Sequence, residues 1–313
     1  MTHKVQKIIS ALFIVGTSIL GFQVLVYIIN LNQPVLFLKT AIWVWLYLCA
    51  MILLFFDLHF KVPGALALAK KRHENVSHRL LRSVKIIWTA LNHRLGHYFR
   101  MQEVKAFLVY LVLPTFLFWF TAAMLYGNMG QEKIQQLYAW ISTAGMGITF
   151  WYLKEAFHRK KERVDSDIFV AFSVAKIYTL TVGFGAGLML LRRYCLDPSL
   201  YAGIVFGISF LLVYQALFQH GFLKAKHLLS ALAIAGAMGI LAYFVYVFWG
   251  FNYFSAAIFM AAFYNLFWGT YHYHLDYGLN RRIFFEILVV CLAVAFLVFV
   301  NTNFKERILG GCF

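Results

Sequence analysis

The chain has 313 residues, of which 62% are hydrophobic and only 13% are charged. A water-soluble domain is closer to half apolar and a quarter charged, so this composition excludes an ordinary soluble protein and indicates a lipid-covered chain. The formal net charge of +16 is also typical of nucleic-acid-binding proteins. Here the basic residues lie at the ends of apolar runs, and the short connections leave no room for a nucleic-acid module, so we expect no nucleic acid as a partner.

Apolar stretches of about 20 residues, the length that crosses a bilayer as a helix, recur along the whole chain. The first follows Lys4 and Lys7 and is too long for the core of a cleavable signal, so we expect it to remain as a span. Together the stretches predict an all-α, polytopic transmembrane helical bundle that forms a single domain over 1–313. The expected spans, about nine in number, are 8–30, 36–58, 106–127, 134–154, 168–191, 199–219, 227–249, 252–272 and 282–302.

The distribution of Lys and Arg predicts the orientation. If the N-terminus is cytoplasmic, 21 of the 28 basic residues lie in inner segments and five in outer ones. An excess of this size on one side is typical of the cytoplasmic side of membrane proteins. We therefore expect a cytoplasmic N-terminus, an outer C-terminus and, as the location, a bacterial inner (plasma) membrane.

The one long connection, 59–105, predicts an additional helix that does not cross the membrane. Apolar residues recur at helical spacing over about 77–100, and the opposite face carries basic residues. This pattern predicts a cytoplasmic amphipathic helix on the membrane surface. The basic 70–100 segment is then expected to contact anionic lipid headgroups.

The four cysteines divide into two groups. Cys49 and Cys291 lie within expected spans, where cysteine acts as a small apolar residue. Cys195 and Cys312 both fall on the expected outer side. In an oxidising compartment these two cysteines would be able to form a disulfide.

All 11 histidines fall in expected cytoplasmic segments or at cytoplasmic span ends, and several have polar neighbours at helical spacing. In the eighth span, Asn265, Gly269, His272 and Asp276 are spaced to share one helix face. Polar groups within a membrane usually point into the helix bundle and mark a functional site. Similar polar groups end three other spans: Trp151, Glu155 and His158; Asp57 and His59; and Gln215, Gln219 and His220.

Imidazoles accompanied by carboxylates predict a metal site, with iron or zinc as the cofactor. A neutral imidazole supplies the lone pair, and a carboxylate fixes its tautomer or itself binds the metal. The expected ligands are His59, His158, His220 and His272, with His274 in reserve, and the expected carboxylates are Asp57, Glu155 and Asp276. The alternative is that each histidine is an interfacial residue bonded to a headgroup or a loop.

Three further features lie within the expected spans. Lys176 is about a third of the way into the fifth span, too deep for its ammonium to reach the surface easily, so we expect it to face the bundle. Arg282 and Glu286 are four residues apart and are expected to pair. Gly183, Gly185 and Gly187 favour close approach of neighbouring helices.

Two families resemble the chain at its histidines. The segment His93-Arg-Leu-Gly-His97 resembles a histidine box of membrane fatty-acid desaturases and hydroxylases. The segment His272-Tyr-His-Leu-Asp276 is similar to the His-x-x-x-Asp elements of the Brp/Blh-type carotene-cleaving dioxygenases. The second resemblance implies a polytopic enzyme with a histidine-bound iron and an apolar substrate, with His272 and Asp276 in its site.

Three hypotheses for function follow. The first is a metal-dependent membrane enzyme, an oxygenase or a hydrolase, that acts on a lipid-soluble substrate near the cytoplasmic face. The second is a transporter or permease whose His, Asp and Glu side chains bind a cation or relay protons. The third is a non-catalytic membrane scaffold. The sequence leaves the substrate, the metal and the oligomeric state open.

Overall fold

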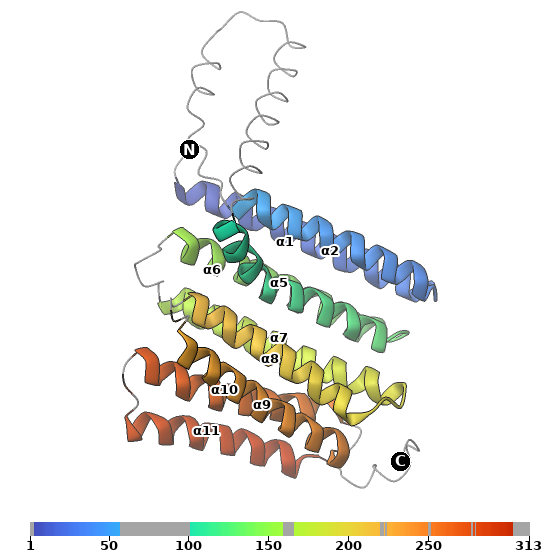
Figure 1. The fold of residues 1–313 in the computed structure, drawn as a ribbon. Helices are drawn as coiled ribbons and strands as arrows, with labels where there is room; N and C mark the ends of the chain where they lie inside the picture. Colours follow the sequence, from blue (N-terminus) through green and yellow to red (C-terminus); the bar gives the residue numbers. More distant parts are fainter. Residues whose placement is uncertain are drawn as a thin grey trace, which may run out of the picture.

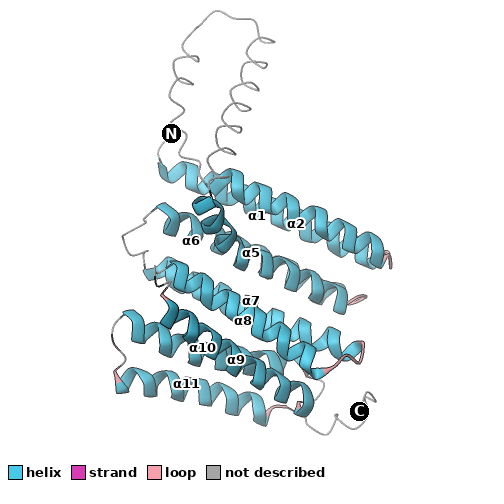
Figure 2. Cartoon of the chain, viewed as in Figure 1, coloured by secondary structure: helices cyan, strands magenta, loops and turns pink. Residues whose placement is uncertain are grey.

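The computed structural model describes residues 3–56, 101–158, 166–219, 222, 224–249, 252–276, 278 and 280–302. Within these ranges the protein is all-α, as expected, and contains no strand (Figure 2). The helices of this part of the chain are α1 (His3–Asn30), α2 (Pro34–Phe56), α5 (Met101–Gly127), α6 (Glu132–His158), α7 (Ser166–Arg193), α8 (Pro198–Gln219), α9 (Ala225–Phe248), α10 (Tyr253–Asp276) and α11 (Arg281–Val300). Each expected span falls on one of them. The expected surface helix at 77–100 lies outside the described residues.

The helices stack side by side, roughly in chain order, from α1 and α2 at one edge of the bundle to α11 at the other (Figure 1). Short turns join α1 to α2, α5 to α6 and α7 to α8 at one end of the bundle, which we call the hairpin end, and α9 ends and α10 begins at the same end. The start of α1 lies at the opposite, N-terminal end. Among the described helices, α7 packs against α5, α6, α8 and α10, while α6 packs against α1, α5 and α7, and α10 packs against α7, α9 and α11.

Of the described helices, seven are long and apolar enough to cross a membrane: α1, α2, α5, α7, α8, α9 and α11. The chain is therefore a multi-pass membrane protein. The remaining two, α6 and α10, are the more polar helices, and each lies between three neighbours. In α6 six polar side chains are turned inward, since Gln135, Ser142, Thr143, Thr149, Lys154 and Glu155 are all buried. Polar groups that face other helices instead of lipid are tolerated within a membrane bundle.

Hydrogen bonds close the hairpin end of the bundle. Arg192, at the end of α7, donates to the carbonyls of Tyr246 and of Trp249, the latter at 2.7 Å. A guanidinium in this position satisfies carbonyl groups that the end of α9 leaves without partners. The hydroxyl of Tyr246 in turn donates to the carbonyl of Leu196 at 2.5 Å. The turn between α7 and α8 is thereby fixed to the end of α9.

The three glycines of α7 allow three neighbours to approach it. A side chain at Gly183 would overlap the ring of Phe120 on α5. At Gly185 an added Cβ would lie 3.3 Å from Ala257 on α10, and at Gly187 it would lie 3.2 Å from Tyr201 on α8. The interpretation of these glycines as packing positions is confirmed. It also explains how α7 lies at the centre of the bundle.

The cysteines agree with their expected grouping as far as the structure describes them. Cys49 and Cys291 have free thiols. Cys195, in the turn between α7 and α8, is disulfide-bonded. Cys312, its predicted partner, lies outside the described residues.

Candidate functional site

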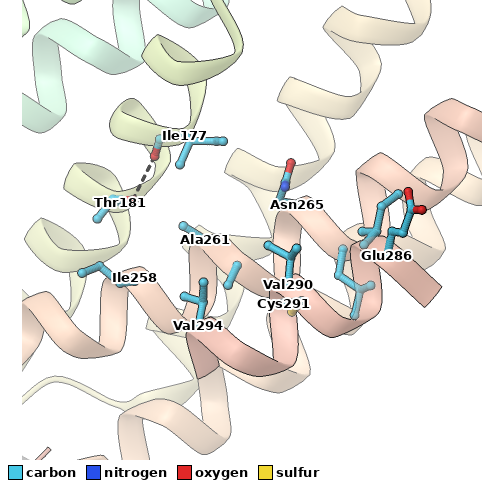
Figure 3. Close-up of a pocket in the computed structure, with 12 residues that line it drawn as sticks. Ile177, Thr181, Ile258, Ala261, Asn265, Glu286, Val290, Cys291 and Val294 are labelled. Atoms are coloured by element: carbon cyan, nitrogen blue, oxygen red, sulfur yellow. Dashed lines mark hydrogen bonds between the residues drawn. The ribbon is translucent and has the colours of Figure 1, made fainter. Parts of the chain in front are cut away.

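A groove runs along the side of the bundle between α7, α10 and α11, and encloses a cavity of about 480 Å³ (Figure 3). The groove residues are Ile177, Thr181, Ile258, Ala261, Ala262, Asn265, Leu266, Glu286, Ile287, Val290, Cys291 and Val294. Its outer wall is α11, whose only buried residues in the part that the structure describes are Cys291 and Ala295. A helix so little covered by protein is covered by lipid, so the groove opens toward the acyl chains of the bilayer.

Most of the groove is hydrocarbon, and its polar groups are few. Thr181 already donates its hydroxyl hydrogen to the carbonyl of Ile177 at 2.9 Å. One oxygen of Glu286, Oε1, accepts a hydrogen bond from Arg282 Nε at 2.9 Å, which confirms the expected pair. Asn265 forms no hydrogen bond with any residue that the structure describes. The Asn265 amide and the second carboxylate oxygen of Glu286 are therefore the groups left to bind a ligand.

Lys176 lies on α7 next to the groove residue Ile177, and its ammonium is held over two aromatic rings of α10. Lys176 Nζ is 4.9 Å from the centre of the Trp268 ring and 5.3 Å from that of Tyr264. In the part of the chain that the structure describes, no carboxylate lies within ion-pairing distance of this ammonium. Aromatic faces attract a cation, by about 2 kcal/mol when it is desolvated. The two rings thus stabilise the ammonium in place of a carboxylate, and the contact joins α7 to α10.

Farther toward the N-terminal end of the bundle, α10 carries two more aromatic contacts. His227, at the start of α9, shares a hydrogen bond of 2.7 Å between its Nδ1 and the hydroxyl of Tyr271. His272 stacks on Trp268 with 5.5 Å between ring centres and 24° between planes. One helix, α10, therefore faces a lysine of α7, a histidine of α9 and the groove under α11.

The predicted metal-site residues are described only in part. His272 is half-buried, whereas His274 is exposed. Because they are two residues apart on a helix, their side chains leave α10 in different directions. The side chains of His158 and Asp276, at the ends of α6 and α10, are not described, and Asp57, His59 and His220 lie outside the described residues. Glu155 is buried on α6.

Among the residues that the structure describes, no three His, Cys, Asp or Glu side chains lie together as a metal site requires. The two expected imidazole ligands whose side chains are described, His272 and His274, do not converge on a common point. The described residues by themselves thus do not fit an iron or a zinc ion. The metal site remains a prediction about residues that include His59 and His220.

Sequence reasoning missed the aromatic partners of Lys176 and the place of Glu286 in the groove. A signal for the first was present, since Tyr264 and Trp268 are four residues apart and must share a face of α10. No such signal existed for the second, because the pairing of Arg282 with Glu286 is local to α11. Only the packing of α7 and α10 against α11 turns Glu286 into a groove residue.

The comparisons with known proteins bring no relative to this site. No family model matches the chain, no curated protein matches it, and no solved structure matches it.

Proposed function

We propose that this protein binds an elongated lipid-soluble molecule in the groove between α7, α10 and α11. The observation that carries the proposal is the amide of Asn265, which lines an apolar groove and has no hydrogen-bond partner among the described residues. In hydrocarbon no water is present to satisfy such a group, and leaving it unpaired costs several kcal/mol. A bound molecule with a polar group at this point would remove that cost.

The dimensions of the groove support a long, narrow ligand. On α11 the lining runs from Glu286 to Val294, and on α10 from Ile258 to Leu266. Since α10 and α11 are antiparallel and joined near Gly278, the two linings overlap only in part and together span about 20 Å at 1.5 Å per residue. The volume of about 480 Å³ lies within the range of ligand pockets in general, roughly 300–1,000 Å³.

Two tryptophan variants test this function with a matched control. Val290 lines the groove and is 62% exposed, whereas Val289, the preceding residue, is 61% exposed and does not line it. We expect Val290→Trp to fill the groove and Val289→Trp to leave it open. The measurement is mass spectrometry of the apolar molecules that copurify with each variant and with the wild-type protein.

The proposal predicts one molecular species, or one narrow class, that is present with the wild-type protein and Val289→Trp and is depleted at least fivefold with Val290→Trp. Equal amounts of every apolar molecule in all three preparations would contradict it. Because both substitutions add the same side chain to the same exposed helix, a difference between them is not explained by hydrophobicity alone.

A metal-dependent enzyme is the second candidate. It is supported by the stacking of His272 on Trp268, which places one expected ligand a single helical turn from the Lys176 contact. His59, His158 and His220 would complete the iron or zinc site, and the metal would activate oxygen or water. Metal analysis of the wild-type protein and of His272→Ala tests this, since equal metal in both, or none in either, removes the hypothesis. A transporter would instead require a water-accessible path to Lys176.

We infer that the N-terminal end of the bundle faces the cytoplasm of a bacterial inner membrane. The support is the excess of Lys and Arg in segments at this end, which also favours contact with anionic lipids at 70–100. Reporter fusions test the orientation. A periplasm-dependent reporter at the C-terminus is expected to be active, and the same reporter in the turn between α8 and α9 is expected to be inactive. The reverse pattern would overturn the inference.

A further inference from the structure

We propose that Asn265 selects the ligand, and that the ligand is an apolar chain with an oxygen function, a hydroxyl or a carbonyl, part-way along its length. The inference rests on the proposed function of the groove and names the chemistry that the groove would recognise. Its starting points are the place of Asn265 midway along α10, the absence of a protein partner for its amide among the described residues, and the apolar side chains that line the groove with it.

Asn265 lies at the middle of α10. The helix has 24 residues, from Tyr253 to Asp276, so Asn265 is about 16–18 Å from either end at 1.5 Å per residue. Glu286, by contrast, lies in the second turn of α11, near the N-terminal end of the bundle. The same helical rise places Asn265 about 9 Å deeper in the groove than Glu286. One small polar headgroup does not reach both residues, so the group that meets Asn265 belongs to the body of the ligand.

The chemistry of a carboxamide restricts this group. The amide donates through Nδ2 and accepts through Oδ1, so a hydroxyl can both give and receive a hydrogen bond, and a carbonyl can receive one. A plain hydrocarbon leaves the amide unsatisfied. An ionised group is excluded because the groove that Asn265 lines is mostly hydrocarbon, including Ile177, Ala261 and Val290, and a charge within the membrane is costly.

A second copy of the chain is the competing occupant. Asparagine in a membrane helix also drives association by bonding across a helix interface. The partly overlapping linings of α10 and α11 form a recessed groove instead of a flat face, and a narrow chain fills such a groove better than a helix about 10 Å wide. We therefore place a lipid-soluble molecule there and treat self-association as an outcome of the test.

The test uses three probes of equal length: a long alkane, its mid-chain alcohol and its mid-chain ketone. Each competes for labelling of the purified full-length protein by a photoactivatable alkane. The variants are Asn265→Leu, which removes the amide, and Thr179→Val, which removes a hydroxyl of α7 that lies outside the groove and is already bonded to the carbonyl of Ala175. Leucine is more apolar than asparagine, so the first variant is expected to insert and fold.

With the wild-type protein and Thr179→Val, we expect the alcohol and the ketone to compete about tenfold better than the alkane, as one hydrogen bond in an apolar site would give. With Asn265→Leu this preference is expected to vanish, while alkane binding is unchanged or stronger. A preference that survives in Asn265→Leu, or no preference in the wild-type protein, would overturn the inference.

Two further readouts separate the explanations. If Asn265→Leu reduces the oligomeric state measured by native mass spectrometry and leaves probe competition unchanged, the occupant is a second copy and the inference is wrong. If Val290→Trp does not weaken competition by any probe, the proposed function itself fails. If Val290→Trp weakens all three probes and Asn265→Leu preserves selectivity, only the role of Asn265 is overturned.

Discussion

The ammonium of Lys176 on α7 lies 4.9 Å from the centre of the Trp268 ring on α10. Tyr264, one turn away on α10, holds the same ammonium at 5.3 Å. A lysine at this depth of a membrane costs about 2.5–3.5 kcal/mol on insertion scales when it is isolated. The two rings offset part of this cost, so the contact joins the two helices that form the floor of the groove.

A double-mutant cycle tests this contact. Lys176→Met and Trp268→Leu together are expected to be less destabilising than the sum of the single changes, with a coupling of about 1–2 kcal/mol. The measurement is the free energy of unfolding in mixed micelles. Lys39→Met, which changes an exposed lysine of α2, is the control and is expected to show no coupling to Trp268→Leu. Additive effects for the Lys176 pair would show that the rings do not stabilise the cation.

Helix packing around α7 is tested by a pair of glycine substitutions. Gly183→Ala is expected to destabilise the protein by about 1–3 kcal/mol, because the new methyl group would overlap the ring of Phe120. Gly203→Ala, on α8, meets no atom within 4 Å and is expected to be neutral or slightly stabilising, since alanine favours a helix. Thermal unfolding of both variants gives the comparison, and equal stabilities would contradict the packing described for α7.

Arg192 is expected to be the more important of two adjacent arginines. Arg192→Gln removes a guanidinium that bonds the carbonyls of Tyr246 and Trp249, and hydrogen bonds from charged groups contribute roughly 1.5–3 kcal/mol each. We expect a loss of about 2–3 kcal/mol in the free energy of unfolding. Arg193→Gln, which changes an exposed neighbour, is expected to change it by less than about 0.5 kcal/mol. Similar losses for both variants would contradict this, because they would show that the positive charge of the segment, and not the hydrogen bonds to the end of α9, stabilises the protein.

The disulfide of Cys195 predicts a specific labelling pattern. Cys312 is the expected partner, because Cys49 and Cys291 have free thiols. Cys195→Ser is expected to release one additional thiol that reacts with a membrane-impermeant maleimide added from the outer side. The wild-type protein is expected to show this reactivity only after reduction. Reaction of Cys195 in the wild-type protein without reductant would contradict the bond.

The helices were predictable from the sequence because the physics that sets them is local. A stretch of about 20 apolar residues has to form a helix in lipid, where each backbone polar group needs a partner. The expected span 36–58 and the observed helix Pro34–Phe56 differ by two residues at each end. The pairing of Arg282 with Glu286 was equally local, since the two residues are one turn apart on α11.

The groove was not predictable, because it depends on which helices become neighbours. The sequence placed Asn265, Gly269 and His272 on one face of α10, but it did not say which helix this face meets. In the structure the nearest atom to a side chain added at Gly269 belongs to Ile287 of α11, and Asn265 lines the groove beneath the same helix. His272, two turns farther along the same face, stacks on Trp268 of its own helix.

Photolabelling with a small apolar diazirine, followed by mass spectrometry of the labelled peptides, tests the central claim most directly. The groove predicts labelling of Ala262, Val290 and Val294 that saturates and that an unlabelled long-chain alcohol competes away. Lipid-facing residues of α2, such as Trp43, are expected to be labelled in proportion to probe concentration, without competition. Labelling of α10 and α11 that is as unsaturable as that of α2 would contradict the account.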